Sequence, residues 1–212
     1  MTNSTLSALY SRAQGAVAYL DESYYAPKQG KGQTFYIVSA VVVGRSKVGE
    51  VRATLLDLVG DDYWHTTTDA RSLEGKETLR QSLDYLKAAS KTLCWLSEPI
   101  DKSDREGEAA RAAVHRAAVR ELTRSYLPSA GMIVYEKRLS GYQANADARV
   151  FNEMRNSGKV DRDFIIHPES PANELLLWAP DMVAWSYRQS FLDNDHAFFE
   201  LLSESVHVQV VK

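Results

Sequence analysis

The pattern of apolar and polar positions along the chain predicts alternating strands and helices. The clearest strand is Phe35 to Val43, a continuous apolar and β-branched run that we expect to be covered on both faces of a sheet. A shorter apolar run, residues 16–21, precedes it and leads into the adjacent carboxylates of Asp21 and Glu22. A loop rich in Gly and Lys separates the two runs, so we expect a hairpin with a long connection.

Further apolar runs predict the remaining strands of the sheet. They cover residues 91–96, 131–136, 163–167 and 206–211, with a short third strand within residues 61–68. Residues 206–211 alternate apolar and polar side chains, which is typical of an edge strand with one face towards water.

Apolar residues at helical spacing predict helices between these strands. The predicted helices cover residues 48–59, 74–89, 103–126 and 144–155, a helix that begins at Pro180-Asp181, and a last helical segment at 195–203. Ser103 followed by Glu106 matches a capping box and sets the expected start of the long helix. This order fits a single α/β domain over residues 1–212, a mixed sheet flanked by helices, with an N-terminal arm at 1–15.

Composition narrows the class of protein. The 212 residues are 44% hydrophobic and 25% charged, which is ordinary for a globular domain. We see no apolar run that approaches the roughly 18 residues of a membrane span and no signal peptide, so we expect a cytoplasmic protein without a membrane partner. The single cysteine, Cys94, fits a reducing compartment and a place in the core. The net charge of -3 gives no overall basic field, so a nucleic-acid partner would need a local basic patch.

Three acids occupy the ends of predicted elements. Asp21 and Glu136 end strands, and Asp181 opens a helix. Strand ends of an α/β sheet converge on one crevice, and carboxylates gathered there stay ionised together only around a cation. Hard oxygen ligands suit Mg²⁺ or Mn²⁺, and a pair of such ions about 4 Å apart can hydrolyse a phosphodiester. The alternative is that these acids are solvated strand ends and a helix cap.

Four segments of the chain carry a further signal. They are Ala18 to Ser23 with the strand 35–43 after it, Trp64-His65-Thr66, Val134 to Arg138, and Glu174 to Trp185. In this order they resemble the bacterial proteins grouped as domain of unknown function 3800, over about residues 17–190. The family's members are largely uncharacterised, and its fold is taken to be similar to that of ribonuclease H.

The resemblance implies roles for the acids. It implies a ribonuclease H-like α/β fold in which Asp21, Glu136 and Asp181 bind Mg²⁺ or Mn²⁺, with Glu22 as a fourth acid. The implied activity is metal-dependent hydrolysis of nucleic acid. Two positions depart from the common pattern: many ribonuclease H-like nucleases have Asp where this chain has Glu136, and Pro180 directly precedes Asp181. If the strand continues past Asp21, Glu22 points to the opposite face of the sheet.

A histidine and four basic residues complete the predicted site. His65 would position water or contact a phosphate, with a structural role as the alternative. Lys28 and Lys31 lie in a basic loop that we expect to reach substrate phosphates. Lys137 and Arg138 follow the strand-end acid in the segment that resembles the family, and we assign them to substrate binding.

Other charged residues have two interpretations each. Asp147 is either a further carboxylate of the site or an exposed helical acid. Glu174 either contacts the site or caps the segment after it. The long helix carries arginines that either contact phosphates or form a solvated face, namely Arg116, Arg120 and Arg124, with Arg111 nearby.

The sequence supports two hypotheses for function. The first is a metal-dependent nuclease or phosphodiesterase. The second is a non-catalytic ribonuclease H-like module for binding or assembly, which the mildly acidic charge favours. Aromatic residues near the C-terminal end form either part of the core or a homodimer surface.

Overall fold

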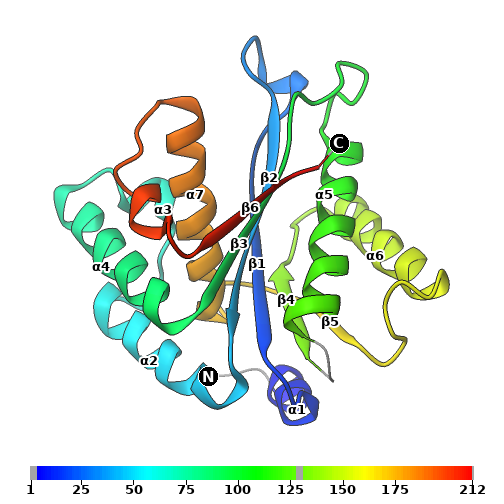
Figure 1. The fold of residues 1–212 in the computed structure, drawn as a ribbon, viewed down its shortest axis with the longest axis horizontal. Helices are drawn as coiled ribbons and strands as arrows, with labels where there is room; N and C mark the ends of the chain where they lie inside the picture. The colour runs from blue at the N-terminus through cyan, green and yellow to red at the C-terminus, as the bar shows by residue number, and fades with distance from the viewer. Residues whose placement is uncertain (1–3, 128–130, 212) are drawn as a thin grey trace.

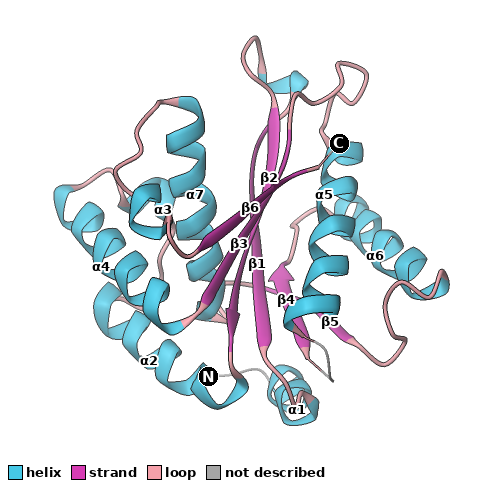
Figure 2. Cartoon of the chain, in the orientation of Figure 1, coloured by secondary structure: helices cyan, strands magenta, loops and turns pink. Residues whose placement is uncertain are grey.

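A mixed sheet of six strands forms the centre of the computed structural model, which describes residues 4–127 and 131–211 (Figures 1 and 2). The strands are β1 (Val17–Tyr25), β2 (Phe35–Val43), β3 (Lys91–Ser97), β4 (Met132–Glu136), β5 (Ile165–Glu169) and β6 (Val206–Val210). Their order across the sheet is β5-β4-β1-β2-β3-β6. The mixed α/β sheet predicted from the sequence is therefore confirmed.

The directions of the strands match the predicted hairpin. β1 and β2 pair antiparallel, and so do β2 and β3. β4 lies parallel to β1 and β5 parallel to β4, while β6 lies parallel to β3. Residues 206–210 form an edge of the sheet, as their alternating pattern indicated.

Helices cover both faces of this sheet (Figure 1). The first face carries α1 (Ser4–Arg12), α2 (Val48–Val59), α4 (Leu73–Ala89) and α7 (Trp178–Leu192), with the short α3 (Thr66–Asp69) beside α7. The second face carries α5 (Glu108–Glu121) and α6 (Gly141–Asn156). Short 3₁₀ or π turns complete the chain, η1 (Pro27–Gln29), η2 (Arg45–Lys47), η3 (Leu122–Tyr126), η4 (Leu175–Leu177) and η5 (Phe199–Leu202). Among the helices of the described residues, none has the length and apolarity to cross a membrane.

The alternation of side chains along β1 and β2 builds two cores. On β1, Tyr19 packs towards α2, α4 and α7, and Leu20 packs towards α5 and α6. Every residue of β2 is buried, which confirms that this strand is covered on both faces. The C-terminal aromatic residues pack against the first core, for example Tyr187 stacked on Phe199 with ring centroids 4.6 Å apart.

Several predicted elements differ from the structure. The first strand continues to Tyr25 instead of ending at residue 21, the helix expected from Pro180 begins at Trp178, and the last helical segment is the short turn η5. The prediction of a strand within residues 61–68 is wrong. Trp64 is buried, its indole N–H donates to Thr66 Oγ1 at 2.8 Å, and α3 begins at Thr66. The long helix begins at Glu108 rather than at Ser103. Ser103 instead donates to Asp101 Oδ1 in a turn, and Asp104 accepts from the backbone N–H of Ala110 at 2.9 Å.

Gly75 provides a test of this packing. It lies in α4, where a Cβ atom would stand 1.9 Å from the backbone oxygen of Asp69. We expect Gly75→Ala to destabilise the protein by about 1–3 kcal/mol, although alanine favours helices, because the two backbone segments must separate. Gly49→Ala in α2 is the matched control, since nothing lies within 4 Å of its Cβ position. Urea unfolding measures the stability of both variants. Equal free energies of unfolding for Gly75→Ala and Gly49→Ala would contradict the close approach of the two backbone segments.

β1 extends beyond the end of its pairing with β4, and this extension positions the site. Its pairing with β2 runs to Tyr25, while its pairing with β4 ends at Leu20. Residues 21–25 therefore have a strand neighbour on the β2 side only, among the residues that the structure describes. The other edge of this segment opens between the parallel pair and the antiparallel pair, where ligands bind in many α/β sheets.

Candidate active site

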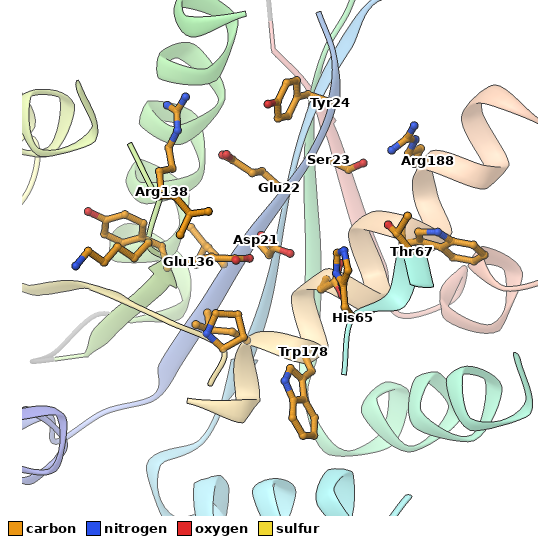
Figure 3. Close-up of a pocket in the computed structure, with 18 of the residues that line it drawn as sticks. Asp21, Glu22, Ser23, Tyr24, His65, Thr67, Glu136, Arg138, Trp178 and Arg188 are labelled. Atoms are coloured by element: carbon orange, nitrogen blue, oxygen red, sulfur yellow. The ribbon is translucent and has the colours of Figure 1, made fainter. Parts of the chain in front are cut away.

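A cavity of about 600 Å³ lies against the free edge of β1 (Figure 3). Its lining includes all five residues assigned to catalysis from the sequence, which are Asp21, Glu22, His65, Glu136 and Asp181. Lys137 and Arg138 also line it, whereas Lys28 and Lys31 do not. Lys28 instead lies 2.8 Å from Glu106 in an exposed ion pair. The structure thus brings the predicted acids together and leaves the basic loop outside the cavity.

Asp21 and Glu136 form the centre of the cavity. Asp21 is only 8% exposed, on the face of β1 that meets α7. Burial raises the pKa of Asp21 well above its usual range, and the charges of Asp181 and Glu136 raise it further. Burial raises the pKa of Glu136 as well. The side chains of Asp21 and Glu136 also hydrogen-bond to each other, which contributes to the raised pKa of Asp21.

Asp181 connects this pair to His65. It lies in the first turn of α7, and its Oδ2 accepts a hydrogen bond of 2.9 Å from the backbone N–H of Thr66. The same oxygen lies 3.8 Å from His65 Nδ1. This interaction raises the pKa of His65, whose side chain is 52% exposed on the cavity side. His65 thus has one ring nitrogen directed at Asp181 and can place a proton near the carboxylates.

The three acids have the donor atoms that a divalent cation prefers, but their present arrangement does not form a metal site. Three carboxylates supply hard oxygen donors, and their mutual repulsion adds to the effect of burial in raising the pKa of Asp21. Within the described part of the chain, however, no three His, Cys, Asp or Glu side chains are arranged to hold a metal ion. Asp21 and Glu136 hydrogen-bond to each other, and Asp181 accepts a hydrogen bond from the backbone N–H of Thr66. Side-chain movements would have to bring three oxygens onto one ion.

Glu22 points to the opposite face of β1, as the alternation of a strand requires. It accepts a hydrogen bond of 2.8 Å from Arg111 Nε and lies 3.3 Å from His115 Nε2, both on α5. Burial opposes its ionisation, but Arg111, His115 and Tyr36 together outweigh burial and lower the pKa of Glu22 to about 2. Arg111 also bonds Asp147 of α6 and is 3% exposed. Glu22 is therefore a fixed negative charge, and Asp147 is a buried ion-pair partner rather than an exposed acid.

Comparison with solved structures identifies the fold. Two structures of Bst-RNase HIII, one of a glutamine-to-alanine variant and one in complex with Mn²⁺, match this chain with a TM-score of 0.51 and 14% sequence identity. The fold is ribonuclease H-like. The matches cover 93% and 95% of this chain but only 56% and 57% of those proteins, so the chain spans little more than half of their length. Neither a family model nor a curated protein matches the sequence, and membership of the domain of unknown function 3800 family stays a prediction.

Sequence reasoning assigned neither Trp185 nor Arg188 to this cavity, and it gave Arg111 either a phosphate contact or a place on a solvated face. Trp185 and Arg188 line the cavity from α7, and Arg111 lines it from α5. Trp185 and Arg188 follow Asp181 by one and two helical turns, so helical spacing from Asp181 would have found them. No sequence signal indicates the contact of Arg111 with Glu22, because 89 positions separate the two residues.

Other candidates from the sequence lie outside the cavity and have structural roles. Glu174 is fully buried, where it accepts hydrogen bonds from Tyr10 and Arg52 at 2.6 Å each and caps η4. Arg116 pairs with Glu153 on the surface at 2.8 Å. The capping interpretation of Glu174 and the solvated interpretation of Arg116 therefore agree with the structure.

His115 gives the stability of the protein a dependence on pH. Burial and the charge of Arg111 lower the pKa of His115 from 6.5 to about 4. The unfolded chain then binds a proton more readily than the folded one, so stability is complete above pH 6.5 and falls as the pH drops towards 4. The loss should reach about 3 kcal/mol. We expect urea unfolding between pH 7 and 4 to show a shallower loss for His115→Gln than for wild type.

The same substitution at the exposed His207 serves as a control for this measurement. His207→Gln should leave the pH dependence of the wild-type protein in place. Identical pH profiles for wild type and His115→Gln would show that folding does not shift the pKa of His115.

Proposed function

We propose that this protein is a metal-dependent nuclease or phosphodiesterase that hydrolyses nucleic acid by two-metal-type chemistry. The observation that carries the proposal is the convergence of Asp21, Glu136 and Asp181, from β1, β4 and α7, in one cavity where burial and the charges of the other two acids raise the pKa of Asp21. A ribonuclease H-like neighbour in complex with Mn²⁺ supports the choice of a divalent ion. Mg²⁺ and Mn²⁺ both suit carboxylate ligands.

The residues around this centre have separate tasks in the proposal. Asp21, Glu136 and Asp181 would hold the ion, which when bound lowers the pKa of water and stabilises the leaving oxygen. His65 would keep Nδ1 directed at Asp181 and offer a proton from Nε2 to the leaving oxygen. Glu22 would position the substrate or the attacking water as a fixed charge.

Basic residues would contact the phosphates of the substrate. Lys137 and Arg138 line the cavity directly after Glu136, so they lie nearest to a bound strand. Arg138 is held by Glu108 and Asp147, which fixes its orientation. Lys28 and Lys31 lie outside the cavity and would meet the strand only beyond its mouth.

Titration with Mn²⁺ tests the metal site without depending on the substrate. We expect calorimetry to show binding by the wild-type protein and weaker binding, by about 10-fold or more, in Asp181→Asn and Glu136→Gln, because each loses one anionic ligand. Asp57→Asn on the exposed side of α2 is the matched control and should bind as wild type does. Absence of binding heat in the wild-type protein would contradict the proposal.

A second candidate is a non-catalytic module that binds nucleic acid. The hydrogen-bonded Asp21–Glu136 pair favours it, because this pair satisfies two acids without a cation. Assays with Mn²⁺ on single-stranded, duplex and hybrid substrates separate the candidates. Binding without cleavage of any substrate would support the second.

A further inference from the structure

Arg188 is a cation of the cavity that has no acidic partner among the described residues. It lies half-buried on α7, and its side chain forms no ion pair or hydrogen bond with the part of the chain that the structure describes. Arg111 and Arg138, by contrast, pair with Glu22 and Glu108. A half-buried charge without a partner costs free energy, which an anionic ligand would offset.

Ser23 supplies a second donor beside this guanidinium. It follows Asp21 by two positions on β1, so both side chains point to the same face. Its side chain is half-buried and has no hydrogen-bond partner among the described residues. Figure 3 shows Ser23 and Arg188 on the same side of the cavity, directed towards one another. A guanidinium and a hydroxyl that converge in this way form donors for a phosphate group.

The positions of Ser23 and Arg188 relative to the carboxylates indicate which phosphate of a bound strand they would contact. Ser23 lies about 7 Å along β1 from Asp21, and Arg188 lies about 10 Å along α7 from Asp181. Ser23 and Arg188 are therefore displaced from the carboxylates along β1 and α7, so their ligand would lie beside a phosphate held by the carboxylates through a metal ion. We propose that Arg188 and Ser23 form a subsite for a neighbouring phosphate of the same nucleic-acid strand. The inference rests on the proposed function in that it takes nucleic acid as the ligand.

Binding measurements without turnover test this subsite. The probe is a short fluorescein-labelled single-stranded oligonucleotide, and anisotropy is followed in EDTA between about 50 and 200 mM salt, with every protein carrying Asp21→Asn. We expect Arg188→Ala to weaken binding about 10-fold and to reduce the slope of log K against log salt by about 0.7, since one phosphate contact is lost. Arg188→Lys should keep the slope, because the charge remains.

Two further variants distinguish this contact from a general effect of charge. Ser23→Ala should weaken binding without changing the slope, because the lost donor is neutral. Arg124→Ala removes an exposed arginine of η3 outside the cavity and should change neither quantity. An unchanged slope in Arg188→Ala, an equal effect in Arg124→Ala, or no binding of the oligonucleotide at low salt would each overturn the inference.

The cleavage assay is a separate measurement, so the two proposals can fail independently. A slope that depends on Arg188 in a protein that never cleaves with Mn²⁺ would remove the proposed hydrolysis and keep the subsite. Cleavage by the wild-type protein together with an unchanged slope in Arg188→Ala would remove the subsite and keep the proposed hydrolysis. Thermal unfolding of each variant shows that it is folded before binding is compared.

Discussion

Asp21→Asn is expected to abolish hydrolysis while making the metal-free protein more stable. Asn keeps a donor for the hydrogen bond to Glu136 and removes the repulsion with Asp181 that raises the pKa of Asp21. The unfolding temperature in EDTA should therefore rise by a few degrees. Cleavage with Mn²⁺ should fall by about 10²- to 10³-fold, since about 3–4 kcal/mol of transition-state stabilisation is lost.

Thermal unfolding and a nuclease assay on the same samples check both parts of this prediction. The control is Asp57→Asn, which changes an exposed carboxylate of α2 and should alter neither quantity. Equal cleavage by wild type and Asp21→Asn would remove Asp21 from the mechanism. A lower unfolding temperature in EDTA would show that the carboxyl group of Asp21 stabilises the fold.

Arg111→Ala is expected to destabilise the protein by about 3–5 kcal/mol. Arg111 is 3% exposed and bonds both Glu22 and Asp147, so its removal leaves two buried acids without their shared cation. Arg116→Ala on the same helix is the matched control. Its ion pair with Glu153 is largely exposed, and the loss should be at most about 1 kcal/mol.

A combined variant separates the loss of charge balance from the loss of packing. Arg111→Met together with Glu22→Gln and Asp147→Asn removes all three charges and keeps similar volumes, so it should recover most of the stability. Urea unfolding at neutral pH measures all three proteins. A loss below about 1 kcal/mol in Arg111→Ala would show that water, rather than Arg111, neutralises these acids.

The fold was largely predictable because its strands are long apolar runs separated by amphipathic helices. β2 is buried over its whole length, and β6 alternates at the edge of the sheet, so each carries a pattern that local sequence displays. The segment 61–68 was not predictable in this way. Its conformation depends on the burial of Trp64 and on the hydrogen bond from Thr66 to Asp181, a contact across 115 positions.

The acids of the site were predictable for the same reason, since an acid at the end of an apolar run stands out in the sequence. Glu136 ends β4 and Asp181 lies in the first turn of α7, whereas Asp21 lies within β1, just past the end of its pairing with β4. The topology brings all three to one cavity. The basic residues follow no such rule. Arg188 can be found only by helical spacing once Asp181 is known to lie in the site. Arg111 lies within α5, and only the packing of α5 against the sheet shows that it faces the cavity.

The alternation along β1 also limits where the chain can change its length. Asp21 and Glu22 are neighbours in sequence, yet Asp21 hydrogen-bonds to Glu136 and Glu22 is held by Arg111 on the other face. Deleting or inserting one residue between Val17 and Leu20 would exchange the positions of the two carboxylates. It would also move the β1 side chains of each core to the opposite face of the sheet. The loop between β1 and β2 carries no such restriction. Natural and engineered length variants should therefore collect in that loop and spare the strand.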